Sequence, residues 1–200
     1  MFGPLGDGDG KQDDNWAIVR TKYVVFEGND VTTGYVRVKH GAENIMIRNN
    51  VIRAPDSNPV GGTSDNIITI VGYDSSYGRT VSNVIVKNNV GITKDWKGEF
   101  FRLENSASGI TLLNNLYVAP NLGSAGSWGT AAAHVYSLSG MSSFTKIDNN
   151  TWPNIDPSSN TERINYAGSY VDLATWNSYA QVGTDKVEDR TSWSGGWPIV

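Results

Sequence analysis

The sequence predicts an all-β chain, folded as a right-handed parallel β-helix of about five coils with a short capping helix at its C-terminal end. Three observations predict this fold. A short phrase of alternating apolar residues that ends in a polar pair occurs five times, a second alternating segment follows each copy, and the loops between them differ in length. Similar strands joined by unequal loops are typical of solenoids, because insertions lie outside the stack.

The repeated phrase predicts the first strand of each coil. In NIMIRNN, residues 44–50, apolar residues alternate with polar ones, as in a strand with one buried face. The other copies are YVVFEGND, NVIVKNN, GITLLNN and FTKIDNN, at 23–30, 83–89, 109–115 and 144–150. We expect the inward-facing pairs to be Val24/Phe26, Ile45/Ile47, Val84/Val86, Ile110/Leu112 and Thr145/Ile147.

The polar pairs predict a ladder of amides at one corner of the coils. Five asparagines align in successive copies: Asn29, Asn50, Asn89, Asn115 and Asn150. Stacked asparagine amides hydrogen-bond to one another and to the backbone. Asparagine also tolerates the left-handed backbone that a sharp corner requires. We therefore expect these residues to hold the stack together rather than to form a row of sugar ligands.

The second alternating segment predicts the second strand of each coil. Its copies are YVRV, IITI, FFRL, VYSL and RINY, at 35–38, 67–70, 100–103, 135–138 and 163–166. Coiling the chain in one rotational sense stacks like strands on like, about 4.8 Å apart, and a right-handed crossover is the default for parallel strands.

The repeat also carries a resemblance to a known family. Residues 20–170, through the phrase V-x-I-x-N-N, resemble the right-handed parallel β-helix proteins of the pectin-lyase-like superfamily. The resemblance implies a carbohydrate-active protein, since polysaccharide lyases, glycoside hydrolases, epimerases and tailspikes share this fold. One solenoid hosts many chemistries, so the reaction has to be argued from the residues.

The ends of the chain depart from the repeat. We divide the chain into an N-terminal acidic lead-in (1–19), the solenoid (20–169) and a cap with a tail (170–200). Within 170–183 four side chains recur at helical spacing: Leu173, Trp176, Tyr179 and Ala180. Asp172 is the expected N-cap of this helix and Gly183 its expected stop.

The lead-in predicts a calcium site. DGDGKQDDN, residues 7–15, resembles the calcium loops of dockerins and thrombospondin type 3 repeats. Carboxylates at short spacing can converge on one hard cation, here from Asp7, Asp9, Asp13 and Asp14. The alternative is a solvated acidic segment that binds no metal.

Composition narrows the function classes. A net charge of -4 argues against a nucleic-acid partner, and without an apolar run of about 18 residues we expect no membrane insertion. The absence of cysteine excludes disulfides and thiol catalysis, and no serine-hydrolase elbow, zinc-protease helix or P-loop is present. The chain begins without a signal peptide, so we expect a fragment of a longer extracellular or cell-surface protein with other domains.

The second strands predict where chemistry lies. Their aligned outward residues are Arg37, Thr69, Arg102, Ser137 and Asn165, and Lys39 and Glu104 fall just past this row. Two arginines on strands that are two rungs apart lie about 9–10 Å from each other. That spacing suits neighbouring carboxylates of an acidic polysaccharide, which guanidinium groups bind well. The alternative is that these are solvated strand charges.

The segment VRVKHG, residues 36–41, is similar to part of the chondroitinase B and alginate lyase family. The resemblance implies that Lys39 acts as a base. A lyase needs a base for the proton α to the uronate carboxylate and a cation for the enolate, which Arg37 or Arg102 would supply. His40 and Glu104 complete this candidate group, although His40 also suits a plain corner position.

The alternative chemistry is hydrolysis by paired carboxylates, with candidates Asp65, Asp74, Asp95, Glu99 and Glu104. We expect an enzyme that acts on an extracellular, acidic polysaccharide, with a lyase favoured over a hydrolase. The competing hypothesis is a non-catalytic carbohydrate-binding or structural fragment of a larger surface protein.

Overall fold

The computed structural model describes residues 15–31, 35–53, 66–75, 77–92, 99–118, 135–137, 140–153, 163–166 and 169–188. These residues are mostly strand, arranged in parallel sheets with very little helix, as an all-β parallel fold requires. No helix among them has the length and apolar character needed to cross a membrane.

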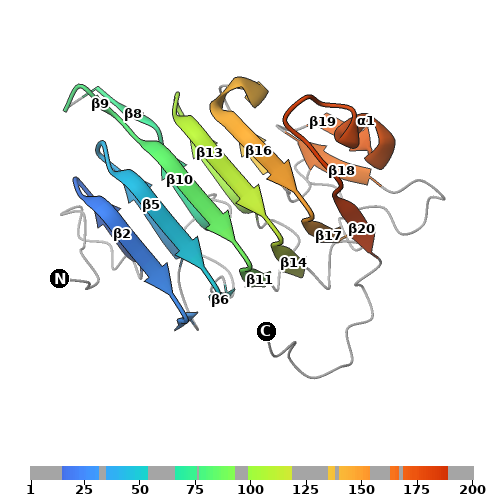
Figure 1. Ribbon diagram of the computed structural model, residues 1–200, viewed down its shortest axis with the longest axis horizontal. Coiled ribbons are helices and arrows are strands. Elements are labelled where there is room, and N and C mark those ends of the chain that lie inside the picture. The colour runs from blue at the N-terminus through green and yellow to red at the C-terminus, as the bar shows by residue number, and fades with distance from the viewer. Residues whose placement is uncertain are drawn as a thin grey trace, which may run out of the picture.

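Most strands of the described residues belong to three largely parallel sheets, and Figure 1 shows the strands of one of them, sheet B, side by side. Sheet A contains β1 (Asn15–Val19), β4 (Tyr35–Lys39), β7 (Asn66–Val71), β12 (Glu99–Glu104), β15 (Val135–Ser137), β18 (Arg163–Tyr166) and the antiparallel β19 (Ser169–Asp172). Sheet B contains β2 (Lys22–Glu27), β5 (Glu43–Arg48), β10 (Ser82–Lys87), β13 (Ser108–Leu113) and β16 (Phe144–Asp148). Sheet C contains β3 (Asp30–Val31), β6 (Val51–Arg53), β11 (Val90–Ile92), β14 (Leu116–Val118), β17 (Thr151–Pro153) and β20 (Lys186–Glu188).

The chain enters the sheets in a fixed rotation. From β2 to β18 successive strands belong to sheets B, C and A in turn, interrupted by an antiparallel hairpin of β8 (Tyr73–Asp74) and β9 (Arg79–Thr80). We call one passage through B, C and A a circuit. Like strands of successive circuits pair with one another, as the unequal loops predicted.

The register of sheet B confirms most of the predicted inward residues. Ile45 pairs with Val84 and Val84 with Ile110, and all three side chains are buried. The prediction for Thr145 is wrong. A register shift between β13 and β16 sets Phe144 opposite Ile110, so the larger apolar side chain fills the core and Thr145 is exposed.

The register of sheet A confirms the predicted row at its start and corrects it at β15. Leu103 pairs with Ser137, so Ser137 faces inward and is buried, and its hydroxyl donates to the carbonyl of Gly140 at 3.0 Å. Val135, rather than the residue after it, takes the core place opposite Phe101. Asn165 is also out of register with Arg37 and Arg102, because Val135 pairs with Tyr166.

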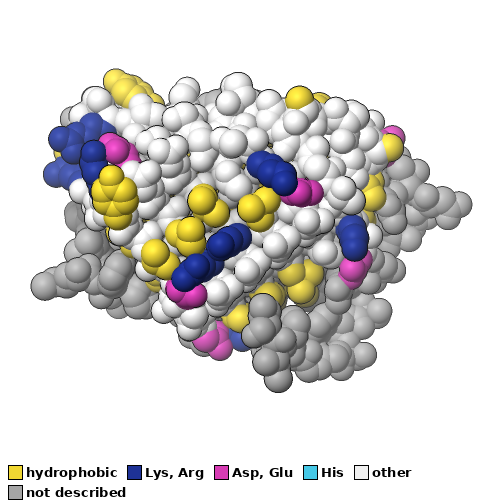
Figure 2. Space-filling model, viewed as in Figure 1, with side chains coloured by type: hydrophobic (Ala, Val, Ile, Leu, Met, Phe, Trp, Pro, Cys, Tyr) yellow, Lys and Arg dark blue, Asp and Glu magenta, His cyan; other side chains and the backbone are white. Residues whose placement is uncertain are grey.

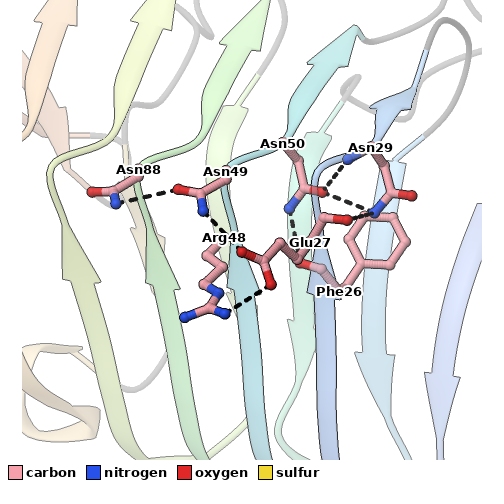
Figure 3. A network of polar contacts seen from close by, with 7 residues as sticks. All are labelled: Phe26, Glu27, Asn29, Arg48, Asn49, Asn50 and Asn88. Atoms are coloured by element: carbon pink, nitrogen blue, oxygen red, sulfur yellow. Dashed lines mark hydrogen bonds and ion pairs between the residues drawn. The ribbon is translucent and has the colours of Figure 1, made fainter. Parts of the chain in front are cut away.

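The amide ladder forms where the chain passes from sheet B to sheet C (Figure 3). From Asn50 onward, the Oδ1 atom of each ladder asparagine accepts both the backbone N–H and the side-chain Nδ2 of the ladder asparagine one circuit earlier, at 2.9–3.1 Å. The left-handed φ falls on the residue before each ladder position: Gly28, Asn49, Asn88, Asn114 and Asn149. In each polar pair, the first residue therefore turns the chain and the second residue joins neighbouring circuits.

Two groups of strands were absent from the prediction. β1 pairs with β4, so sheet A already begins at Asn15, inside the predicted lead-in. Sheet C was taken for loop, because its strands have only two or three residues and cannot display a period of two. Their buried side chains, Ile52, Tyr117 and Trp152, nevertheless extend the core.

The C-terminal cap is shorter than predicted. Asp172 is the N-cap, as expected, and accepts the backbone N–H of Thr175 at 2.6 Å. The helix α1 spans only Leu173–Asn177 and ends at its C-cap Ser178, five residues before the predicted stop at Gly183. Trp176 is buried as predicted, whereas Ala180 is exposed.

Candidate functional site

Two arginines lie in register on the outer face of sheet A. Arg37 of β4 pairs with Thr69 of β7, and Thr69 pairs with Arg102 of β12. Their neighbours Val38, Ile70 and Leu103 point into the core and are fully buried. β7 therefore lies between the two strands that carry the arginines, and the backbones of Arg37 and Arg102 are about 9–10 Å apart.

Two glutamates join these arginines in a row of ion pairs. The Oε1 atom of Glu104 accepts from Nε of Arg102 at 2.9 Å, and Oε2 of Glu104 lies 3.8 Å from NH2 of Arg37. The carboxylate of Glu99 accepts from NH1 of Arg102 at 3.0 and 3.1 Å. The row Arg37–Glu104–Arg102–Glu99 is therefore neutral overall when all four groups are ionised.

Burial sets the proton affinities within this row. Burial raises the pKa of the Glu99 carboxyl, although the charge and hydrogen bonds of Arg102 oppose the rise. Burial alone would lower the pKa of Arg102, but the charges of Glu99 and Glu104 outweigh it and raise that pKa. Arg102 therefore stays protonated, and Glu99 takes up a proton more readily than an exposed glutamate.

Some hydrogen-bonding capacity of the row is unused. The Nε–H of Arg37 and the hydroxyl of Thr69 are buried and have no hydrogen-bond partner among the described residues. Lys39, the last residue of β4, forms no ion pair with any described residue. The predicted base therefore lies beside the arginine row, but the structure does not join it to Glu104.

His40 lies at the corner that leads from sheet A to sheet B, in contact with the β8–β9 hairpin. Its Nδ1 hydrogen-bonds to Oδ2 of Asp74, and its ring packs edge-on against Tyr77 with the centroids 4.8 Å apart. The guanidinium carbon of Arg20 lies 3.7 Å from the centroid of the Tyr77 ring. Residues from three successive circuits thus meet at this corner.

The structure changes the grouping of the predicted residues. Asp74, predicted as one of a carboxylate pair, pairs with His40 instead, and Glu99 and Glu104 share Arg102. Asp65 and Asp95 lie outside the described residues, as do the four aspartates of the predicted calcium loop. Within the described part, no three His, Asp or Glu side chains are grouped as metal ligands.

Sequence reasoning missed Arg20 and Tyr77. Neither belongs to a repeated phrase, and Tyr77 is 57 residues beyond Arg20 in the chain. The available signal was the interval 72–81, GYDSSYGRTV, which is longer than the other turns between a second strand and the next first strand and contains two tyrosines. An insertion of this kind in one circuit is a typical place for a binding site.

Among the described residues, the outer face of sheet B offers no comparable group. In Figure 2 several of its Lys and Arg side chains lie next to Asp or Glu, with apolar side chains between these pairs. Arg48 pairs with Glu27 at 2.8 Å and Lys146 with Asp148 at 2.7 Å.

No family model matches the chain, and no curated protein or solved structure matches it either. The function therefore has to be argued from the geometry of sheet A and its corner.

Proposed function

We propose that the chain is a right-handed parallel β-helix of the pectin-lyase-like kind, and that it binds and cleaves an extracellular acidic polysaccharide on the outer face of sheet A. The repeated V-x-I-x-N-N phrase and the rotation of the strands through three sheets support the fold. The function is supported by one observation above all, the register of Arg37 and Arg102 on either side of Thr69.

The pairing with Glu104 is compatible with this role. The contact between Arg37 and Glu104 is the longest of the row at 3.8 Å, and both side chains are partly exposed. Ion pairs between partly exposed groups contribute little free energy, commonly about 0–1 kcal/mol. A uronate carboxylate of the polymer, which can bind a guanidinium through two hydrogen bonds, therefore replaces Glu104 at Arg37 at low cost.

The charges on the outer face of sheet A suit β-elimination best. It requires a cation to stabilise the enolate that forms when the proton α to the carboxylate leaves. Lys39, which forms no ion pair with a described residue, supplies positive charge at the end of β4, and Arg37 supplies more once the polymer replaces Glu104 beside it. The product carries a new carbon–carbon double bond, which absorbs ultraviolet light.

Hydrolysis is the second candidate, and a specific observation favours it. Glu99 and Glu104 both hydrogen-bond to Arg102, and burial raises the pKa of Glu99. A carboxyl with a raised pKa beside a second carboxyl is the arrangement of a glycosidase acid and its partner base or nucleophile. Hydrolysis creates reducing ends without a double bond, so the two candidates give different products.

The test combines binding with product analysis. Polygalacturonate, alginate and chondroitin sulfate are the acidic polymers, and a neutral β-glucan is the control polymer. We expect calorimetry to detect binding of an acidic polymer that weakens as salt rises, since charges about 10 Å apart are screened at 0.1 M salt. Arg37→Gln should weaken that binding, whereas Lys146→Gln on the outer face of sheet B should not.

The outcomes separate the candidates. Ultraviolet absorbance of the digest indicates elimination, reducing ends without absorbance indicate hydrolysis, and binding without either product indicates a carbohydrate-binding solenoid. If no acidic polymer binds at low salt, or if Lys146→Gln weakens binding as much as Arg37→Gln, the outer face of sheet A is not a polysaccharide site.

A further inference from the structure

We propose that His40, positioned by Asp74, is the proton acceptor of the elimination, and that Arg20 binds the carboxylate of the uronate sugar being cleaved. This inference rests on the proposed function and deepens it. It moves the reacting centre from the arginine row to the adjoining corner, which we call the His40 corner and define as Arg20, His40, Asp74, Tyr77 and Arg79.

The hydrogen bond to Asp74 prepares the imidazole of His40 as a base. A carboxylate only accepts, so the Nδ1 atom of His40 must be the donor. In the neutral ring the proton therefore sits on Nδ1, and Nε2 carries the free lone pair. The same carboxylate stabilises the imidazolium that forms when Nε2 takes a proton, which is how a positioned acid group assists a histidine base.

The backbone at this corner is unfavourable for Arg20. Arg20 and His40 have φ values of 50° and 59°, and the corner residue after β12, Asn105, has a φ of 61°. Glycine and asparagine adopt this left-handed conformation at least cost, and histidine adopts it more often than most residues. Arginine gains nothing from the conformation itself. A strained residue of this kind points to a function of its side chain.

Two described cations without an ion pair lie at this corner. Arg20 and Arg79 form no ion pair with another described residue, whereas Lys22, Arg48 and Arg53 each pair with a carboxylate. Arg79 packs so closely on Gly41 that a Cβ there would lie 2.5 Å from the Cβ of Arg79. The one carboxylate of the corner, Asp74, is engaged by His40. An anionic ligand therefore meets two cations there.

The hairpin supplies the apolar part of a sugar site. Tyr77 is 47 % exposed and Tyr73 is 44 % exposed, and both belong to the insertion between β7 and β10. Aromatic side chains present a flat apolar face together with a polar edge, which suits the faces of sugar rings. The exposed rings of Tyr73 and Tyr77, the cations of the corner and the base His40 together favour a sugar that carries a carboxylate.

The proposed step balances without any further reactant. Nε2 of His40 takes the proton α to the carboxylate, and the electron pair of that C–H bond forms the new carbon–carbon double bond. The bond between the adjacent ring carbon and the glycosidic oxygen breaks, and the imidazolium returns the proton to the departing oxygen. Arg20 stabilises the negative charge that develops on the carboxylate during the transfer.

The decisive variant is His40→Asn. Asparagine occupies the equivalent corner after β12, so this change suits the left-handed backbone and should leave the melting temperature equal or higher. It removes the base, so we expect the rate of unsaturated product formation to fall about 100-fold or more while the affinity for the polymer is unchanged. Arg20→Asn should weaken binding by about tenfold. Lys87→Asn, at a sheet B cation that forms no ion pair with another described residue, is the matched control.

Asp74 is a positioning residue, and its test is the pH profile of the rate. The groups that contact His40 are Asp74 and Tyr77 of the hairpin, while Arg20 lies over the Tyr77 ring and Arg79 packs on the adjacent Gly41. Asp74→Asn removes the only negative charge among them. We expect the acidic limb of the rate profile to move to lower pH and the maximal rate to fall, which a purely structural role would not produce.

Each outcome decides the proposal. Product formation that survives in His40→Asn overturns the role of His40, even if the polymer binds as proposed. Wild-type protein that binds an acidic polymer but releases no unsaturated product overturns this inference and leaves the binding face of sheet A intact. Protein that binds no acidic polymer overturns both. Loss of product formation in His40→Asn, with affinity and melting temperature kept, supports the assignment.

Discussion

At the scale of single residues, Asp185 explains how the amide ladder ends. Its Oδ1 accepts the backbone N–H and Nδ2 of Asn150 at 2.8 and 3.1 Å. Its Oδ2 accepts the indole N–H groups of Trp152 and Trp176, both at 2.9 Å. An asparagine would continue the ladder at Oδ1 but would turn an NH₂ group toward two indole donors. A carboxylate is therefore the side chain that can close the ladder.

Asp185→Asn should consequently destabilise the protein despite its nearly identical shape. The change leaves buried indole donors without an acceptor, at a cost of about 1–3 kcal/mol for an unsatisfied buried group. Urea denaturation measures the loss as a lower midpoint. Asp172→Asn serves as the matched control, because asparagine caps a helix as well as aspartate does. Equal stability of Asp185→Asn and wild type would contradict this account of the ladder's end.

At the scale of elements, the segment after α1 is joined to sheet B by backbone hydrogen bonds with Ile147 and Asn149 and by one carboxylate. Asp148 of β16 accepts the backbone N–H of Thr184 at 2.8 Å and pairs with Lys146 at 2.7 Å. Gly183 is required beside it, since a Cβ there would lie 2.2 Å from Oδ1 of Asp148. The approach of this segment lets Val182 bridge to Ile147 and continue the stack.

This attachment should depend on pH. The hydrogen bond from Lys146, aided by the Thr184 N–H, lowers the pKa of Asp148 below its ordinary value of 3.8. The native state therefore binds this proton more weakly than the unfolded state, so the stabilisation is present above pH 3.8 and disappears as pH falls through the native pKa. We expect Asp148→Asn to lower the free energy of unfolding at pH 7 and to have a much smaller effect near pH 2. An effect of Asp148→Asn that is the same at both pH values would refute this linkage.

At the scale of the whole molecule, local sequence patterns predicted the strands that repeat in each circuit. They missed the contacts that join one circuit to another. The alternation around Ile45 and Ile47 predicted the strands and their register, because each buried side chain stacks on its equivalent one circuit away. The shift at Ser137 could not be foreseen, since VYSL offers two apolar residues for the core and only the neighbouring strand selects between them.

The candidate site shows the same division. The arginine row followed from strand alignment, because parallel register carries a residue of one strand to its equivalent on the next. The pairing of His40 with Asp74 joins residues 34 positions apart through a hairpin that occurs in one circuit only among those described. No periodicity encodes such a contact, so the structure was needed to reveal it.

The central claim is that an acidic polysaccharide lies over sheet A and its corner, and mapping a short oligouronide by NMR tests it most directly. We expect the largest backbone shift changes in β4, β7 and β12 and in the β8–β9 hairpin, with the imidazole signals of His40 among them. The backbone shifts of β2, β5 and β16 in sheet B, whose charged side chains form ion pairs, should remain unchanged. Shift changes confined to sheet B or sheet C, or no changes at low salt, would contradict the account.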